Sequence, residues 1–167
     1  MMLRSITTSV LLAVASLAYA QDDAHQLDVE SVDAIIDAYY DVISGPAGHE
    51  YDAERDAALH APLAIITRLS AAGLDSRHDL AAEQDTVPPV YEEAFFEVEV
   101  NRIVEHYGNM AHVWSTYEVR PSPEGNASSL GLNSISLYRD GGRWWIASWS
   151  TQLVDDDNPL PDRYLGR

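Results

Sequence analysis

The carboxyl-terminal half of the chain contains four segments rich in β-branched and aromatic residues, and two short turn sequences join them in pairs. The segments span residues 97–106, 110–120, 132–139 and 143–153. The first pair is joined at Tyr107-Gly108-Asn109 and the second at Asp140-Gly141-Gly142. Turns with glycine or asparagine where a positive φ is needed are typical of β-hairpins. The pattern therefore predicts two long hairpins and makes antiparallel sheet the main element of the fold.

The amino-terminal half predicts helices instead. Apolar residues recur at helical spacing over residues 29–44, where Ser31 or Asp28 can cap the start and Gly45-Pro46 ends the helix. The next elements predicted are a helix over 52–60, a short strand over 64–67, a loop over 70–85 and a helix over 88–95. Helices followed by antiparallel strands indicate an α+β fold rather than alternating βαβ units.

The first twenty residues have the order of a secretory signal peptide. Arg4 supplies a positive charge, residues 6–17 are mostly apolar, and Ala18-Tyr19-Ala20 precedes a polar segment. The apolar run is too short to span a bilayer. We therefore expect a signal peptide over 1–20, a domain over 21–154 and an acidic tail over 155–167, in a secreted or periplasmic protein.

The composition is strongly acidic, with 27 Asp and Glu against ten basic residues, every one of which is Arg. A net charge of −17 repels phosphate backbones and anionic lipids, which argues against nucleic-acid partners and against membrane binding after signal removal. The chain has no Cys, which excludes disulfides and thiolate metal sites. We expect no metal and no cofactor.

The second predicted hairpin has apolar side chains on both faces. One face carries Asn133, Ile135, Leu137, Trp144, Ile146 and Ser148, and the other carries Leu132, Tyr138, Trp145 and Trp149. Helices from a chain of this length cover one face only, and large apolar patches are seldom left in water. The outer aromatic face therefore predicts a homodimer.

Three stretches resemble a known superfamily. They are residues 40–62 with Gly45-Pro46-Ala47-Gly48, residues 97–118 and residues 131–146. Together they resemble the nuclear transport factor 2-like superfamily, in an uncharacterised secreted branch of the SnoaL-like kind. The resemblance implies a cone-shaped, curved antiparallel sheet wrapped around N-terminal helices, also described as a cystatin-like roll. It also implies a pocket at the open end for a small hydrophobic ligand.

The catalytic groups of the best-known enzymes of this superfamily are not evident. Ketosteroid isomerases carry a carboxylate base near the position of Leu63–Thr67, where this chain has no acid. The Asp/Arg/Asp relay of the epoxide hydrolases and the paired histidines of scytalone dehydratase cannot be placed. The fold therefore predicts a pocket without specifying a reaction.

Four residues are predicted to bind the ligand: Arg102, Tyr117, Asn133 and Trp144. A two-residue turn at Gly108-Asn109 pairs Arg102 with Ser115 and Val100 with Tyr117 on the inward face. An inward Arg needs a partner, which a ligand carboxylate, Glu99 or a helix acid can supply. Asn133 can orient a ligand carbonyl or tie two strands together.

Three residues are candidates for catalysis: Tyr40, His60 and Glu99. Tyr40 can stabilise an oxyanion or simply pack against the sheet. His60 can act as a general base or serve only as a helix-terminal residue. Glu99 is the other candidate base, and with Glu97 and His112 it could form a carboxylate–histidine cluster on the opposite face.

The predicted function is a secreted small-molecule-binding domain. The alternative is a cofactor-free isomerase, cyclase or dehydratase acting on a small hydrophobic carbonyl compound.

Overall fold

A computed structural model describes residues 26–167, so the predicted signal peptide lies outside the described residues. The helices are α2 (Val32–Ile43), α3 (Ala53–Leu59), α4 (Leu80–Gln84) and the 3-10 helix η1 (Asp162–Leu165). The strands are β1 (His60–Ser70), β2 (Gly73–Asp79), β3 (Phe96–Tyr107), β4 (Met110–Arg120), β5 (Ser129–Asp140) and β6 (Arg143–Leu153). Between residues 26 and 167, no helix combines the length and the apolar character required to cross a membrane.

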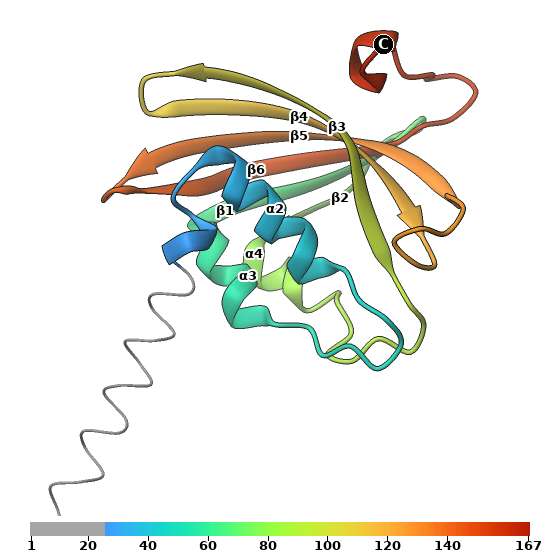
Figure 1. The fold of residues 1–167 in the computed structure, drawn as a ribbon, viewed down its shortest axis with the longest axis horizontal. Helices are drawn as coiled ribbons and strands as arrows, with labels where there is room; N and C mark the ends of the chain where they lie inside the picture. Colours follow the sequence, from blue (N-terminus) through green and yellow to red (C-terminus); the bar gives the residue numbers. More distant parts are fainter. Residues whose placement is uncertain (1–25) are drawn as a thin grey trace, which may run out of the picture.

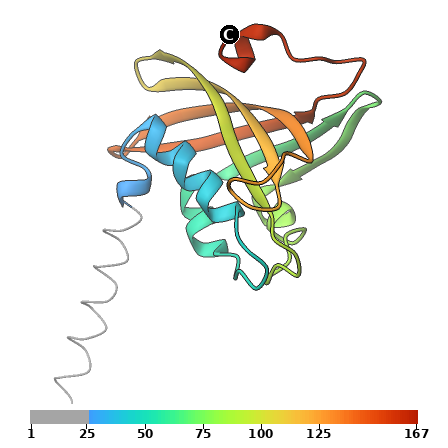
Figure 2. The ribbon, with the colours of Figure 1, turned by 45° about the vertical axis from the view of Figure 1, so that its right-hand side comes forward.

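The six strands form one curved, unclosed sheet in the order β2-β1-β6-β5-β4-β3. Neighbouring strands are antiparallel except for β1 and β6, which run parallel. Both predicted hairpins are confirmed, and Gly108, Gly141 and Gly142 have the positive φ that their turns require. Helices α2, α3 and α4 lie on one face of the sheet (Figures 1 and 2). The predicted α+β class and the curved sheet wrapped around helices are confirmed.

Helix α2 supplies much of the core. Ser31 caps its start by accepting a hydrogen bond from the backbone N–H of Ala34. Ile35 and Ile36 are completely buried among side chains that include Val113 and Ile146. Burying one such side chain contributes about 1.5–3 kcal/mol, so the apolar stripe of α2 fixes this helix against the sheet.

Two β-bulges change which residues point inward. In β3 the register shifts between Glu99, which lies opposite Tyr117, and Asn101, which lies opposite Thr116. The predicted pairing of Val100 with Tyr117 is therefore wrong, and Val100 is 42% exposed. Because a bulge adds one residue to a strand, Glu99 returns to the same face as Arg102.

The second bulge lies in β6, where Ile146 pairs with Leu137 but Ser148 pairs with Ser136. The extra residue is Ala147. As a result Trp149, rather than Ser148, lies on the inward face and is buried. The predicted division of this hairpin into two faces is correct for β5 and for β6 up to the bulge, and it is reversed in β6 beyond the bulge.

The predictions for residues 60–95 need correction. Strand β1 begins at His60 and continues to Ser70, and the segment predicted as a loop contains β2 and α4. The polar sequence of β2 is compatible with a strand that lies at the sheet edge and pairs only with β1. Residues 88–95 are not helical, because their backbone pairs with the loop after α2 through the bridges Gly45↔Phe95 and Glu50↔Val90.

The carboxyl-terminal segment folds back onto the face of the sheet opposite the helices (Figures 1 and 2). Tyr164 is buried against Trp114, with ring centroids 5.2 Å apart. Its carbonyl oxygen accepts hydrogen bonds from Thr116 Oγ1 at 2.6 Å and Asn101 Nδ2 at 3.0 Å. Part of the outer face is therefore covered by this chain's own tail, and the predicted homodimer stays a prediction.

Candidate functional site

A cavity of about 770 Å³ lies between the helices, the concave face of the sheet and residues 86–97. Its walls include Tyr39 and Ile43 of α2, Asp56 of α3, and His60, Ile66 and Arg68 of β1. The other lining residues are Tyr51, Leu80, Glu83, Thr86, Val87, Pro88, Pro89, Val90, Tyr91, Glu92, Glu93, Phe95, Glu97 and Trp149. A cavity of this size, mostly apolar with a few polar groups, is typical of sites for small organic molecules.

His60 lines this cavity, and one of its ring nitrogens is buried without a hydrogen-bond partner in residues 26–167. Its Nδ1 lies 2.8 Å from the backbone carbonyl oxygen of Asp56, at the junction of α3 and β1. A carbonyl only accepts, so Nδ1 carries a proton, and in the neutral tautomer Nε2 is the acceptor. Nε2 is buried and has no hydrogen-bond partner in residues 26–167. Of the seven predicted site residues, His60 is the one that lines the cavity.

Asp56 lies beside His60 and is buried. Its Oδ2 accepts hydrogen bonds from the Tyr51 hydroxyl at 2.6 Å and from Gln84 Nε2 at 2.9 Å. Its Oδ1 is 3.5 Å from His60 Nδ1. Burial and the charge of Asp56 raise the pKa of Tyr51, which keeps that hydroxyl protonated as a donor. Asp56 is thus a fixed negative group that supports the His60 ring.

Glu97 supplies a carboxyl group at the start of β3. Its side chain makes no hydrogen bond to the described part of the chain, and it is incompletely buried. Burial raises the pKa of Glu97 to about 7, and the positive charge of Arg68 opposes this only in part. The carboxyl group therefore exchanges its proton near neutral pH. Strict strand alternation predicts Glu97 on the opposite face, and the bulge in β3 brings it to the inward face instead.

Arg68 is already partnered within the cavity wall. Its Nη1 forms an ion pair with Glu83 Oε1, and the other oxygen of Glu83 lies 3.1 Å from His78 Nδ1. The guanidinium lies 5.4 Å from the centre of the Trp149 ring, within cation–π range. Most of its charge is therefore balanced by Glu83.

Tyr39 adds a hydroxyl group to the wall. Its ring packs edge-on against Trp149, with centroids 5.9 Å apart, and its centroid is 6.4 Å from that of His60. Within residues 26–167 its hydroxyl makes no hydrogen bond. Burial, followed by the charge of Glu97, raises the pKa of Tyr39 well above its usual value, so the hydroxyl stays protonated.

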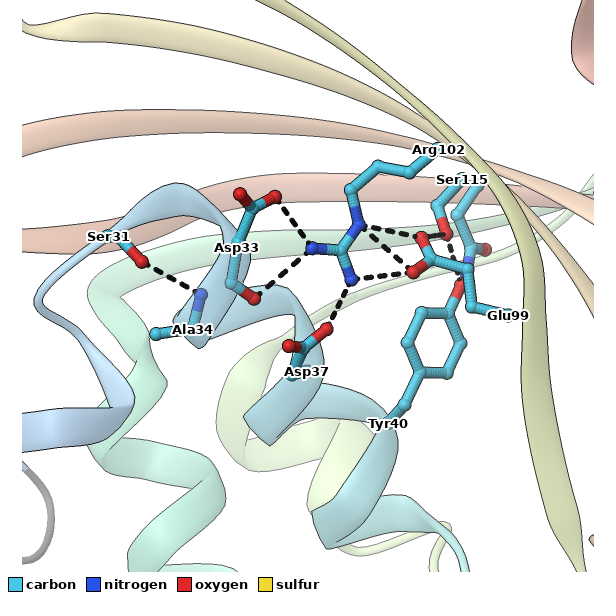
Figure 3. Close-up of polar contacts among 9 residues, drawn as sticks. Ser31, Asp33, Ala34, Asp37, Tyr40, Glu99, Arg102 and Ser115 are labelled. Atoms are coloured by element: carbon cyan, nitrogen blue, oxygen red, sulfur yellow. Dashed lines mark hydrogen bonds and ion pairs between the residues drawn. The ribbon is translucent and has the colours of Figure 1, made fainter. Parts of the chain in front are cut away.

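Four of the predicted residues meet in a different place, between α2 and strands β3 to β5. Figure 3 labels three of them, Tyr40, Glu99 and Arg102. We call this cluster, made of Tyr40, Glu99, Arg102, Ser115 and Asn133, the α2 anchor. Asn133 Nδ2 donates to the Tyr40 hydroxyl at 3.1 Å, which donates to Ser115 Oγ at 2.6 Å. Ser115 in turn donates to Glu99. The direction follows because an ionised carboxylate only accepts.

Arg102 completes the α2 anchor with three carboxylates. Its Nε lies 3.0 Å from Glu99 Oε2, and its Nη1 and Nη2 lie 2.9 Å and 2.5 Å from Asp33 and Asp37 (Figure 3). The partners predicted for an inward Arg were a ligand carboxylate, Glu99 or a helix acid. In the structure Arg102 contacts Glu99 and two acids of α2, Asp33 and Asp37. In this cluster only Asn133 Oδ1 is buried without a partner.

Tyr117 and Trp144 lie outside both clusters. The Tyr117 hydroxyl is 2.8 Å from Thr151 Oγ1, and its ring fills the space beside Gly131, where a Cβ would come within 2.4 Å of the ring. Trp144 packs against His106 and donates its backbone N–H to the carbonyl of Val29 at 2.9 Å. Neither residue lines the cavity, and their roles in ligand binding stay predictions.

Several cavity residues were missed by sequence reasoning, namely Tyr39, Asp56, Arg68, Glu83 and Trp149. The signal available for Tyr39 was its place beside Tyr40 on the apolar face of α2. Arg68 and Glu83 are brought together by the pairing of β1 with β2 and α4, which the polar sequence of residues 70–85 does not indicate.

Comparisons with known proteins identify the fold. No protein-family model and no curated protein matches the chain. A nuclear transport factor 2-like protein from Novosphingobium aromaticivorans has a TM-score of 0.57 at 15% identity, over 91% of this chain and 94% of its own. An uncharacterised cystatin-like protein from Caulobacter vibrioides scores 0.58 at 14% identity, over 77% and 90%. A third, of unknown function, from Shewanella baltica scores 0.52 at 11% identity, over 83% and 98%.

These likenesses extend over most of each chain, at identities too low to carry over an activity. This protein therefore has the nuclear transport factor 2-like, cystatin-like fold. What the cavity does has to be argued from its own residues.

Proposed function

We propose that this protein is a small-molecule-binding domain and that the 770 Å³ cavity is its ligand site. The observation that carries the proposal is the unpaired Nε2 of His60, which is buried in the cavity wall. Buried polar atoms in native proteins almost always have a hydrogen-bond partner. A ligand with an N–H or O–H group supplies one here.

The remainder of the cavity fits a ligand with a largely apolar body. Ile43, Ile66, Phe95 and Trp149 offer apolar surface, and each Å² of apolar ligand surface removed from water contributes about 25 cal/mol. The hydroxyl of Tyr39 and the carboxyl of Glu97 add two further polar groups with no hydrogen-bond partner among residues 26–167. A few polar groups on an apolar wall orient a ligand rather than merely enclose it.

The test is ligand retention by the native protein. The protein purified from its own host is extracted and analysed by untargeted mass spectrometry, beside His60→Ala and the control His112→Ala, whose ring contacts Trp114 and Ser134 on the outer face. We expect a compound retained by the wild type and the control but lost from His60→Ala. Equal retention by all three, or no compound above a mock purification, contradicts the proposal.

A second candidate function is cofactor-free isomerisation, cyclisation or dehydration of a small hydrophobic carbonyl compound. It is supported by one cavity holding an imidazole acceptor, a carboxyl group with a pKa of about 7 and the protonated hydroxyl of Tyr39. In this scheme His60 is the base, Glu97 transfers the proton and Tyr39 stabilises the oxyanion.

Proton abstraction can be tested before the product is known. A retained carbonyl ligand is incubated with the protein in D₂O, and exchange at the carbon next to the carbonyl is followed by mass spectrometry. We expect His60→Ala to slow exchange by about 10²–10⁴-fold. Exchange that is no faster than in buffer leaves the protein as a binding domain.

The proposal includes export and dimerisation. Supporting features are the signal-peptide pattern of residues 1–20 and the half-buried aromatic residues Tyr138 and Trp145 on the outer face. We expect amino-terminal sequencing of the exported protein to begin at Gln21 and light scattering to give the mass of a dimer. Retention of residues 1–20, or a monomeric mass at micromolar concentration, contradicts these two statements respectively.

A further inference from the structure

We infer that the ligand of this cavity is an organic cation, an amine with a bulky apolar body whose N–H groups are accepted by His60 and Glu97. This inference deepens the proposed function and rests on it. Three independent features of the cavity support it: the sign of its charge, its surplus of hydrogen-bond acceptors and its aromatic wall.

The first feature is charge. Five carboxylate residues line the cavity, namely Asp56, Glu83, Glu92, Glu93 and Glu97, against the single guanidinium of Arg68. Arg68 is itself paired with Glu83. The remaining acids belong to a chain whose net charge is −17, so the potential in the cavity attracts cations and repels carboxylate ligands.

The second feature is the balance of donors and acceptors. Three of the cavity's hydroxyl donors are engaged: Tyr51 donates to Asp56, Tyr91 to the carbonyl of Ile43, and Thr86 to the carbonyl of Glu83. The groups left to a ligand are Nε2 of His60, the carboxyl of Glu97, the hydroxyl of Tyr39 and the N–H groups of Arg68 that do not contact Glu83. A ligand with N–H donors matches the acceptors among these groups, and the cationic donor of the wall, Arg68, is already paired with Glu83.

His60 and Glu97 both lie near Tyr39. The ring centroids of Tyr39 and His60 are 6.4 Å apart, and the charge of Glu97 acts on the Tyr39 hydroxyl strongly enough to raise its pKa. Both acceptors line the cavity together with Tyr39.

The third feature is the aromatic wall formed by Tyr39, Tyr51, Tyr91, Phe95 and Trp149. Aromatic faces attract cations, most strongly those of Trp and Tyr. One cationic side chain already contacts this wall: the guanidinium of Arg68 lies 5.4 Å from the centre of the Trp149 ring. An ammonium group with an apolar body can use the same wall together with the aliphatic side chains beside it.

Binding of a cation is expected to depend on pH through Glu97. An ammonium group favours the ionised carboxylate, so binding releases a proton and strengthens as the pH rises through about 7. The charge of Arg68 in β1 lowers the pKa of Glu97. The charge of Glu97 in turn raises the pKa of four tyrosines: Tyr39 and Tyr40 of α2, Tyr91, and Tyr117 of β4. The tyrosines stay protonated over this range, because burial raises the pKa of each.

Three probes with one apolar body test the inference: 1-adamantanemethylamine, 1-adamantanemethanol and 1-adamantanecarboxylate. Binding of each to the native protein is measured by calorimetry at pH 6 and pH 8 and constant ionic strength. At pH 8 we expect the amine to bind at least about tenfold more tightly than the alcohol, and the carboxylate to bind weakest. We expect the affinity of the amine to be about tenfold higher at pH 8 than at pH 6.

Glu97→Gln is expected to remove both the preference for the amine and its pH dependence. The matched control is Glu118→Gln, a residue that pairs with Arg120 outside the cavity and should leave both unchanged. Wild-type measurements with the three probes decide the matter even if the variant is unstable. An alcohol that binds as tightly as the amine overturns the inference and leaves the proposed function intact. Failure of all three probes to bind at millimolar concentration counts against the proposed function itself.

Discussion

The protein contains two polar clusters built from the same kinds of residue, and they differ in whether their partners come from the chain. In the α2 anchor a continuous chain of donors runs from Asn133 to Glu99, and Arg102 is held by three carboxylates. In the cavity, His60 Nε2 has no partner among residues 26–167. The comparison teaches that residue type alone does not identify a site. The α2 anchor, satisfied internally except at Asn133 Oδ1, holds the fold together, whereas the unpaired groups that line the cavity are available to a ligand.

The largest effect is expected at Glu97, because the cavity keeps its carboxyl partly protonated. The pKa of about 7 lies above the ordinary value of 4.5, so the folded protein binds this proton more tightly than the unfolded chain does. The stability contributed by the proton is complete below about pH 4.5 and is lost as the pH rises through 7. A difference of this size corresponds to about 3 kcal/mol.

Glu97→Gln should therefore raise the free energy of unfolding at pH 8 relative to the wild type and leave it little changed at pH 4.5. Urea denaturation at several pH values measures both. The control is Glu118→Gln, for which the pH profile should match that of the wild type. If the stability of the wild type falls between pH 5 and pH 8 by no more than that of Glu97→Gln, the pKa of Glu97 is not raised as described.

The next effect is expected at Arg102, at the centre of the α2 anchor. Its side chain is 15% exposed, and Arg102→Ala leaves Glu99 without its cation while Asp33 and Asp37 turn to water. We expect a loss of about 2 kcal/mol of stability, below the value for a fully buried pair because two of the acids are exposed. Urea denaturation measures this, with the exposed Arg139→Ala as control. Ligand retention should be unchanged. If Arg102→Ala loses the ligand while keeping the stability of the wild type, Arg102 is part of the ligand site.

The structural features that can be predicted from the sequence are those set by residues close together in the chain. The hairpin turns at Gly108 and Gly141 depend on two or three consecutive residues, one of which must adopt a positive φ. Both turns were predicted. The stripe of α2 that contains Ile35, Ile36 and Tyr39 is likewise readable from its period. In contrast, β2 is polar and becomes a strand only because β1 lies beside it, so its own residues do not indicate it.

The composition of the cavity was the least predictable part. Strand alternation placed Glu97 and Trp149 outward, and one extra residue in each strand reverses that assignment. Bulges have no strong sequence signal, and they change the face of every residue beyond them. His60 was found because its type and its position at the junction of a helix and a strand were informative without knowledge of strand register.

The smallest and most discriminating effect is expected from two adjacent tyrosines of α2, since Tyr39 faces the cavity and Tyr40 belongs to the α2 anchor. Tyr40→Phe removes the hydroxyl between Asn133 and Ser115 and should lower stability by about 1 kcal/mol without affecting ligand retention. Tyr39→Phe removes a hydroxyl that makes no hydrogen bond within residues 26–167, so stability should change by less than about 0.5 kcal/mol while ligand affinity falls. Denaturation and retention measured on both variants form a matched experiment, because the substitution and the helix are the same. If both substitutions lower stability equally and neither alters retention, the distinction between a satisfied and an open cluster fails.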